Sequence, residues 1–233
     1  MNQVSAIIPA AGIGSRFGEP KQFKILAGHT LFFHSLKIFL YSNFIKEIIL
    51  VVPQHYTEII YNDLKSISYK KRVKIISGGD HRQDSVKKGL NVSSESTNLV
   101  CIHDAARPFV TENMIERSIL ACKKYDGSVV ALPSVDTVKL SDNGQIKETL
   151  DRKRVWLAQT PQSFIKDKLI AAFEHADKNN IIGTDESKLM EVMGFSIKLI
   201  EGDPTNFKIT TREDWERANQ ICIRKSMKKD SEE

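Results

Sequence analysis

The segment Pro9–Gln22 holds the densest group of residues that could take part in chemistry. It reads Pro-Ala-Ala-Gly-Ile-Gly-Ser-Arg-Phe-Gly-Glu-Pro-Lys-Gln, so small residues lie beside two cations, Arg16 and Lys21. Alanine and glycine let backbone N–H groups approach a phosphate closely, and the two cations add positive charge to the same loop. A nucleoside triphosphate, which carries several negative charges, needs this combination. A glycine-containing turn with two solvated cations is the structural alternative.

Two well-known glycine-rich loops do not fit this segment. A dinucleotide-binding loop needs a glycine where Phe17 stands, and an acidic residue at the end of the second strand, where Val52 and Pro53 stand. A P-loop needs Gly-Lys-Ser or Gly-Lys-Thr at the start of a helix, and the chain contains neither tripeptide. The segment therefore predicts a phosphate-binding loop of another kind.

Two further clusters also follow apolar runs. Gly78–Ser85 has two glycines before a candidate helix start, so its backbone amides and serine hydroxyl could read the edge of a base or bind an anion. An ordinary strand-to-helix turn would have the same sequence features. In His103–Pro108, Asp104 could hold a ribose hydroxyl or Mg²⁺, or form an ion pair with Arg107. The six histidines show no metal-ligand spacing, so we interpret His103 as a packed residue.

Apolar runs that alternate with helical patterns must position these clusters. Because the runs are apolar on both faces, they predict helices covering both sides of a mostly parallel sheet. Ligands of such sheets bind at the carboxyl ends of the strands, where the three clusters lie. The expected strands are 4–8, 48–52, 73–76, 99–102 and 128–132, and the expected helices are 30–41, 55–66, 81–90 and 111–124.

The alternation breaks at 136–160. Asn143-Gly144 lies between the strand-like runs 137–140 and 145–149, which is a strong hairpin signal. We expect one domain over 1–233, with an arm at about 136–153 that projects and packs against a second subunit. Helical patterns return at 166–178 and 184–193, a strand is expected near 196–200, and a last helix starts at Thr211 with Asp214 as its capping partner.

Composition narrows the class of protein. The 233 residues are 41% hydrophobic and 27% charged, as in a globular protein, and the net charge of +5 suits an anionic small molecule. The basic residues are dispersed and lack interleaved aromatic residues, which argues against nucleic acid as a partner. The three cysteines are odd in number and far apart, which predicts a reducing compartment. No apolar run approaches the about 18 residues that span a bilayer, so we expect a cytoplasmic protein without membrane contact.

Together and in this order, the motifs resemble those of the 2-C-methyl-D-erythritol 4-phosphate cytidylyltransferases of the non-mevalonate isoprenoid pathway. The similarity runs from Ala6 to about Asp214 and includes the three clusters together with Thr-Pro-Gln, Thr-Asp-Glu and Asn-Phe-Lys-Ile-Thr. It implies a Rossmann-like nucleotidyltransferase fold and a homodimer with interlocking arms. It also implies transfer of CMP from CTP to methylerythritol phosphate, with Mg²⁺ as cofactor and pyrophosphate as the second product.

The resemblance also implies residue roles. Arg16, Lys21 and Lys208 match catalytic cations, and Arg152 matches an arginine donated by the partner's arm to the sugar-phosphate site. Mg²⁺ would be held mainly by the CTP phosphates, with Asp104 as a candidate ligand. The other expected sugar-phosphate residues are Thr137, Thr184 and Arg107. The expected nucleotide-binding residues are Ala10, Ala11, Gly12, Gly14, Gly79, Asp80, Ser85, Asp104 and Ala105. Phe207 departs from the family pattern, where an aliphatic residue is usual.

Two alternatives remain open at this point. A ribitol-5-phosphate cytidylyltransferase of wall-polymer synthesis would share the scaffold, although Ala-Ala-Gly at 10–12 and Thr-Asp-Glu at 184–186 favour the methylerythritol family. A regulator that binds CTP without transfer would have little use for Lys208 as a third cation beside Arg16 and Lys21. Release of pyrophosphate would separate the enzymes from the regulator.

Overall fold

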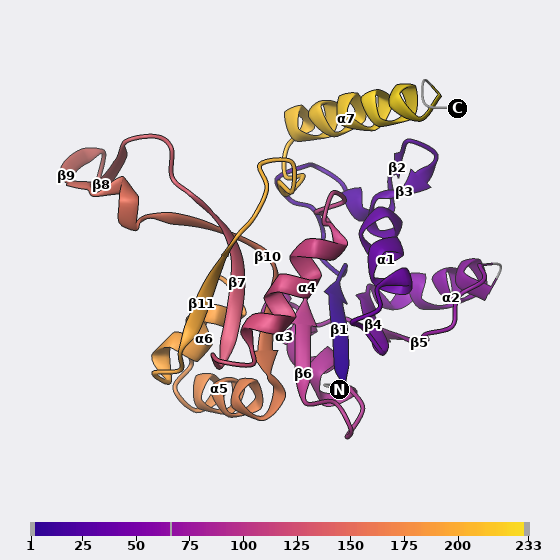
Figure 1. Cartoon of the computed structure of the whole chain (residues 1–233), viewed down its shortest axis with the longest axis horizontal. Coiled ribbons are helices and arrows are strands. Elements are labelled where there is room, and N and C mark those ends of the chain that lie inside the picture. The colour runs from indigo at the N-terminus through magenta and orange to yellow at the C-terminus, as the bar shows by residue number, and fades with distance from the viewer. Residues whose placement is uncertain (1–2, 66, 231–233) are drawn as a thin grey trace.

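A seven-stranded sheet in the order β11-β7-β10-β6-β1-β4-β5 runs through the molecule (Figure 1). The computed structural model describes residues 3–65 and 67–230. Strand β10 is antiparallel to both of its neighbours, and every other pair in the sheet is parallel, as expected. The strands are β1 (Val4–Pro9), β4 (Glu47–Val52), β5 (Arg72–Ser77), β6 (Leu99–Ile102), β7 (Gly127–Pro133), β10 (Trp156–Ile165) and β11 (Ile197–Glu201).

Helices cover both faces of this sheet. On β1, Ala6 and Ile8 pack into a cluster with α1, α2 and α4, whereas Ile7 packs into a second cluster with α3, α5 and α6. Side chains alternate between the faces of a strand, so an unbroken apolar run is what two covered faces require. The helices are α1 (Leu31–Tyr41), α2 (Thr57–Lys65), α3 (Arg82–Asn91), α4 (Glu112–Ala121), α5 (Lys166–Lys178), α6 (Glu186–Val192) and α7 (Arg212–Asp230). Within the described part of the chain, no helix is both long and apolar enough to cross a membrane.

Strand β10 is the element that the sequence pattern does not reveal. It lies between β6 and β7, yet its middle reads Gln-Thr-Pro-Gln-Ser at 159–163. Its pairing with β7 shifts register between Ala158 and Gln162, around a cis peptide bond at Thr160–Pro161. Proline cannot donate to a strand ladder and is tolerated at such an irregularity. The polar run is therefore part of the sheet, although no strand was expected there.

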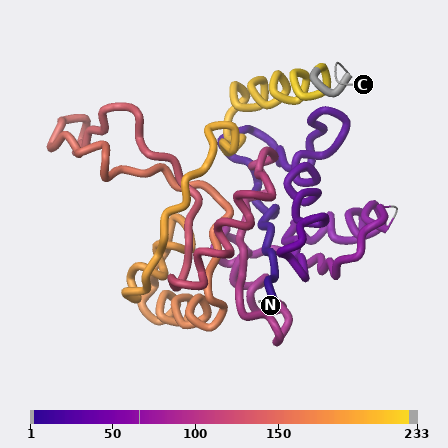
Figure 2. Tube along the Cα trace, viewed as in Figure 1, coloured from indigo at the N-terminus to yellow at the C-terminus, as the bar shows by residue number. Residues whose placement is uncertain are grey.

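The expected hairpin is present and projects from the body (Figures 1 and 2). Strands β8 (Val138–Asp142) and β9 (Gln145–Leu150) pair antiparallel, and Asn143 and Gly144 turn between them with φ of 48° and 81°. Two residues of positive φ give the turn whose twist matches that of the flanking strands. A smaller hairpin, β2 (Ile25–Leu26) with β3 (His29–Thr30), was not expected from the sequence.

The packing of α3 on β1 gives a test of the fold. Gly89 is buried on α3, and a Cβ atom there would lie 2.7 Å from Cγ2 of Ile7. We expect Gly89→Val to lower the free energy of unfolding by about 1–3 kcal/mol, because the added atoms overpack a filled core. Asn91→Val, at an exposed position on the same helix, should change it by no more than about 0.5 kcal/mol. Urea unfolding measures both, and equal losses would contradict this packing.

Candidate active site

The three clusters meet around a cavity of about 580 Å³. The loop after β1, the start of α3, the loop after β6 and the segment before α7 form its walls. The carboxyl ends of parallel strands gather these loops at one edge of the sheet. Among the lining residues are Ala10, Ala11, Gly12, Gly14, Arg16, Lys21, Gly79, Asp80, Ser85, Asp104, Ala105 and Lys208. The expected nucleotide-binding residues and catalytic cations are thus brought together.

Two residues give the loop after β1 its shape. Gln22 is buried, and its Nε2 donates to the carbonyl oxygens of Ala10 at 2.9 Å and Gly12 at 2.6 Å. Gly14 has φ of 71°, and a Cβ atom there would lie 1.9 Å from the carbonyl oxygen of Glu19, so only glycine fits. Sequence reasoning included Gln22 in a motif but did not foresee that it closes the loop.

Like charges are concentrated in this cavity. Burial lowers the pKa of Lys21, and the nearby charges of Lys208 and Arg16 lower it further. Asp104 and Asp214 oppose that shift only in part. An anionic ligand would relieve this repulsion, because opposite charges a few ångströms apart attract strongly at a partly desolvated site.

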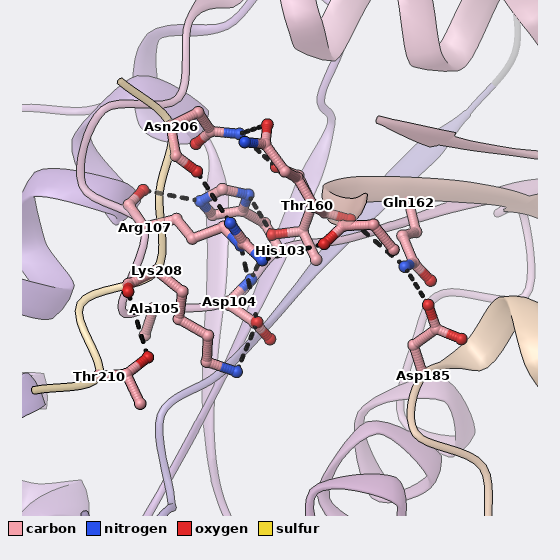
Figure 3. Close-up of polar contacts among 12 residues, drawn as sticks. His103, Asp104, Ala105, Arg107, Thr160, Gln162, Asp185, Asn206, Lys208 and Thr210 are labelled. Carbon is pink, nitrogen blue, oxygen red and sulfur yellow. Dashed lines mark hydrogen bonds and ion pairs between the residues drawn. The ribbon is translucent and has the colours of Figure 1, made fainter. Parts of the chain in front are cut away.

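Asp104 is the negative centre of the site (Figure 3). Its Oδ1 accepts from Nε of Arg82 at 2.9 Å, its Oδ2 lies 2.8 Å from Nζ of Lys208, and Nε of Arg107 is 3.9 Å from Oδ2. Burial alone would raise the pKa of Asp104, but Arg82, Lys208 and Arg107 hold it well below its usual value. The carboxylate therefore stays ionised at physiological pH. The Asp104–Arg107 ion pair, the alternative to a ribose or Mg²⁺ role for this carboxylate, is present as the longest of these three contacts.

Arg82 and Glu186 are functional candidates that sequence reasoning missed. Nη1 of Arg82 donates to both carboxylate oxygens of Glu186, at 2.7 and 2.9 Å. Glu186 is buried, and this burial raises its pKa even though Arg82 opposes the shift. The two residues are 104 positions apart, so no local spacing could reveal the pair.

A second cavity of about 230 Å³ adjoins the first. Arg82, Asp104 and Lys208 line both cavities. The smaller cavity also includes the predicted Thr184 and Arg107, together with Gln159, Thr160, Gln162 and Asp185, which sequence reasoning did not assign to the site. Asp185 caps α6 by accepting from the backbone of Lys188 at 3.1 Å, so the helix begins two residues later than expected.

A buried hydrogen-bonded chain supports Asp104 from behind (Figure 3). The backbone N–H of Asp104 donates to Oγ1 of Thr160, which contacts Nδ1 of His103, and Nε2 of His103 contacts the carbonyl oxygen of Arg107. Burial lowers the pKa of His103 to about 4, so its ring is neutral at physiological pH. His103 is a packed residue, as predicted. Nη1 of Arg107 in turn donates to the carbonyl oxygen of Asn206 at 2.9 Å.

Thr137 and Arg152 line neither cavity in this chain. Both are exposed on the segment that carries the arm, and Nη1 of Arg152 donates to the carbonyl oxygen of Val135 at 3.0 Å. The expected contribution of Arg152 from a partner's arm needs a second chain, so it stays a prediction, as does the role of Thr137.

The cavity offers few ligands for a metal ion. The described residues contain no group of three or more histidine, cysteine, aspartate or glutamate side chains able to hold one. Asp80 and Asp104 are the carboxylates that line the larger cavity, and both oxygens of Asp104 already contact cations. A donor set this small fits Mg²⁺ bound mainly through substrate phosphates and water, its common mode in nucleotide sites.

Comparisons with known proteins identify the family of this chain. Residues 4–224 match the model of the family described as IspD, 2-C-methyl-D-erythritol 4-phosphate cytidylyltransferase. The enzyme of that name from Caldanaerobacter subterraneus subsp. tengcongensis is 41% identical, over 91% of this chain and 95% of the relative. The one from Syntrophus aciditrophicus is 38% identical, over 91% and 92%.

Solved structures of two similar proteins share the fold of this chain. The 4-diphosphocytidyl-2C-methyl-D-erythritol synthase of Anaerococcus prevotii has a TM-score of 0.86 and 32% identity, covering 94% of this chain and 96% of that one. The 2-C-methyl-D-erythritol 4-phosphate cytidylyltransferase of Francisella tularensis has a TM-score of 0.79 and 33% identity, covering 94% and 99%. This chain belongs to the 2-C-methyl-D-erythritol 4-phosphate cytidylyltransferase family.

Proposed function

We propose that this chain transfers CMP from CTP to 2-C-methyl-D-erythritol 4-phosphate, forming CDP-methylerythritol and pyrophosphate in the non-mevalonate isoprenoid pathway. The larger cavity takes CTP and the smaller one takes the sugar phosphate. One observation carries this assignment of cavities, namely that Arg82, Asp104 and Lys208 line both of them. The α-phosphorus of the nucleotide and the phosphate of the acceptor would meet at that shared boundary.

The chemistry at this boundary needs no protein nucleophile. The acceptor is a phosphate monoester whose second pKa is about 6, so it is mostly a dianion at neutral pH. One of its oxygens bonds to the α-phosphorus of CTP, while the opposite bond to the bridging oxygen breaks and pyrophosphate leaves with the electron pair. Catalysis is then positioning and charge stabilisation. His103, buried and neutral behind Asp104, is not required as a base.

The cations of the cavity have to bring two anions together. Arg16 and Lys21 would hold the triphosphate from the loop after β1, while Lys208 would reach the acceptor and the α-phosphate from the shared boundary. Lys208 now pairs with Asp104 at 2.8 Å, which keeps its ammonium at this boundary before an acceptor arrives. Fixed cations of this kind stabilise the charge that collects around the phosphorus.

Mg²⁺ fits this arrangement as a companion of the nucleotide. The CTP phosphates would supply most of its ligands, and Asp104 would take part only by giving up one of its contacts with Arg82 or Lys208. When bound, the ion neutralises phosphate charge and polarises the phosphoryl oxygens.

The projecting arm fits a role in forming a homodimer. We propose that the chain is one nucleotidyltransferase domain whose arm, at about 136–153, packs on a second copy. Arg152 is exposed at the base of this arm and lines neither cavity of its own chain, so its side chain is placed to enter the partner's sugar-phosphate site. Leu140 and Ile146 are exposed on the arm, 48% and 66% respectively, and would be covered by the partner.

The acceptor is tested by offering two sugar phosphates. With CTP and Mg²⁺, we expect pyrophosphate release with methylerythritol 4-phosphate and little with ribitol 5-phosphate. Turnover with ribitol 5-phosphate alone would keep the chemistry and overturn the acceptor. Binding of CTP without pyrophosphate release with either acceptor would overturn catalysis itself.

Removing one cavity cation should slow the reaction without unfolding the protein. We expect Lys21→Ala and Lys208→Ala each to lower kcat by about 10²- to 10³-fold, the loss typical of one group that stabilises developing charge. Lys37→Ala, on the exposed face of α1, is the matched control and should keep full activity. Full activity in either cavity variant would remove that lysine from the mechanism.

Complementation tests whether Arg152 acts in the partner's site. Arg152→Ala and Lys21→Ala homodimers should each be nearly inactive. Mixed after exchange of subunits, they should regain about a quarter of wild-type activity, because half of the dimers then have one intact site. No recovery, in a mixture shown to contain mixed dimers, would mean that Arg152 acts within its own chain or only holds the dimer together.

A further inference from the structure

Helix α7 joins the two segments that carry the cavity cations. Phe17, next to Arg16, and Ile209, next to Lys208, are buried in one small apolar cluster with Ala218 of α7. This cluster is separate from the two that cover the sheet. Figure 1 shows α7 across one end of the body, beside the loop that follows β1. The helix is therefore part of the support of the cavity.

The contact with the loop after β1 is aromatic. Trp215 lies at the start of α7, and its ring centroid is 5.7 Å from that of Phe17, with the planes tilted by 59°. Nζ of Lys21 lies 5.8 Å from the Phe17 ring, and Nζ of Lys24 lies 5.6 Å from the Trp215 ring. Tilted aromatic pairs and nearby cations attract each other at these distances. The Phe17–Trp215 contact thus fixes the part of the loop that bears Arg16.

The contact with the Lys208 segment is polar. Oδ2 of Asp214 accepts from the backbone N–H groups of Thr210 at 2.8 Å and Thr211 at 2.9 Å, the capping expected from the sequence. The guanidinium of Arg217 lies 4.2 Å from the centroid of Phe207, the residue that departs from the family pattern. Asp214 and Arg217 therefore attach α7 to both sides of Lys208.

We propose that α7 clamps the two cationic segments together, with Trp215 as the positioning residue that sets Arg16 and Lys21 relative to Lys208. Arg16, Lys21 and Lys208 repel each other across the cavity, and Asp104 pairs with Lys208, so groups outside the cavity are needed to hold Arg16 and Lys21 at a fixed distance from Lys208. Trp215 and Asp214, adjacent in α7, supply the two contacts that impose this distance. This inference rests on the proposed placement of the triphosphate on Arg16 and Lys21.

The clamp makes nucleotide binding and α7 docking interdependent. If the Phe17–Trp215 contact favours the loop conformation that binds triphosphate, bound triphosphate must favour the contact by the same factor. The indole of Trp215 should then report binding of CTP, although it does not line the cavity.

Fluorescence tests this coupling. The chain has two tryptophans, so Trp156→Phe leaves Trp215 as the only one. In this variant we expect CTP with Mg²⁺ to shift the Trp215 emission saturably, with a midpoint near the KM for CTP, and Phe17→Leu to abolish most of the shift. An unchanged emission at saturating CTP would overturn the clamp, and so would a shift that Phe17→Leu leaves intact.

Comparing the KM values for the two substrates shows whether Trp215 positions the cations or only stabilises the fold. We expect Trp215→Leu to raise the KM for CTP by about tenfold, the upper range for one aromatic contact, and the KM for methylerythritol phosphate by much less. Trp215→Phe should restore most of the affinity for CTP, and Ile223→Ala, 52% exposed on the same helix, should match wild type. An equal rise in both KM values, or no rise, would overturn the proposal. If Trp215→Leu does not fold, Phe17→Leu takes its place with the same expected split.

The Lys21→Ala variant distinguishes failure of the clamp from failure of the proposed function. If Lys21→Ala loses turnover while Trp215→Leu keeps a normal KM for CTP, the triphosphate placement stands and only the clamp is wrong. If Lys21→Ala keeps full activity, the placement on which the clamp rests is itself wrong.

Discussion

Repulsion among cations gathered for one polyanion is the constraint on which this site depends. Lys21, Arg16, Lys208 and Arg82 line one partly desolvated cavity, and Arg107 lines the smaller cavity beside it. Charges that leave water must be paired, since an isolated buried charge costs several kcal/mol. Asp104 meets this need for three of the five cations, and Glu186 completes the neutralisation of Arg82 from α6. The result is an alternating series of charges, Glu186, Arg82, Asp104 and Lys208, that leads from the interior to the boundary between the two cavities.

The sheet brings these charges to one edge although their sequence positions are distant. The loops after β1, β5 and β6 reach the cavity because their strands run parallel. The first loop contributes backbone amides, the second leads into the start of a helix, and the third carries the Asp104 carboxylate. Antiparallel β10 brings the polar run around Thr160 to the smaller cavity. In the proposed function, the backbone and the glycines recognise the nucleotide and the charges act on its phosphates.

Much of this architecture could be predicted, because the signals are local. Apolar runs such as that in β4 identify strands covered on both faces, and Asn143-Gly144 identifies the hairpin. Strand β10 could not be predicted, since its polar centre is satisfied by partners far away in sequence. The Arg82–Glu186 pair and the closure of the loop by Gln22 likewise depend on distant contacts. The role predicted for Arg152 depends on contacts with a second chain, and within its own chain Nη1 of Arg152 donates to the carbonyl oxygen of Val135.

The buried carboxamide of Gln22 has an electrostatic consequence. It draws the carbonyl oxygens of Ala10 and Gly12 toward itself. In a planar trans peptide the N–H points opposite to the C=O, so the N–H groups of Ala11 and Ile13 are turned the other way. A single neutral side chain thereby sets the direction of two peptide dipoles in the loop. The anion binding proposed for this loop would then rest on its backbone as well as on its lysine and arginine, and it would persist at an ionic strength that screens exposed charges.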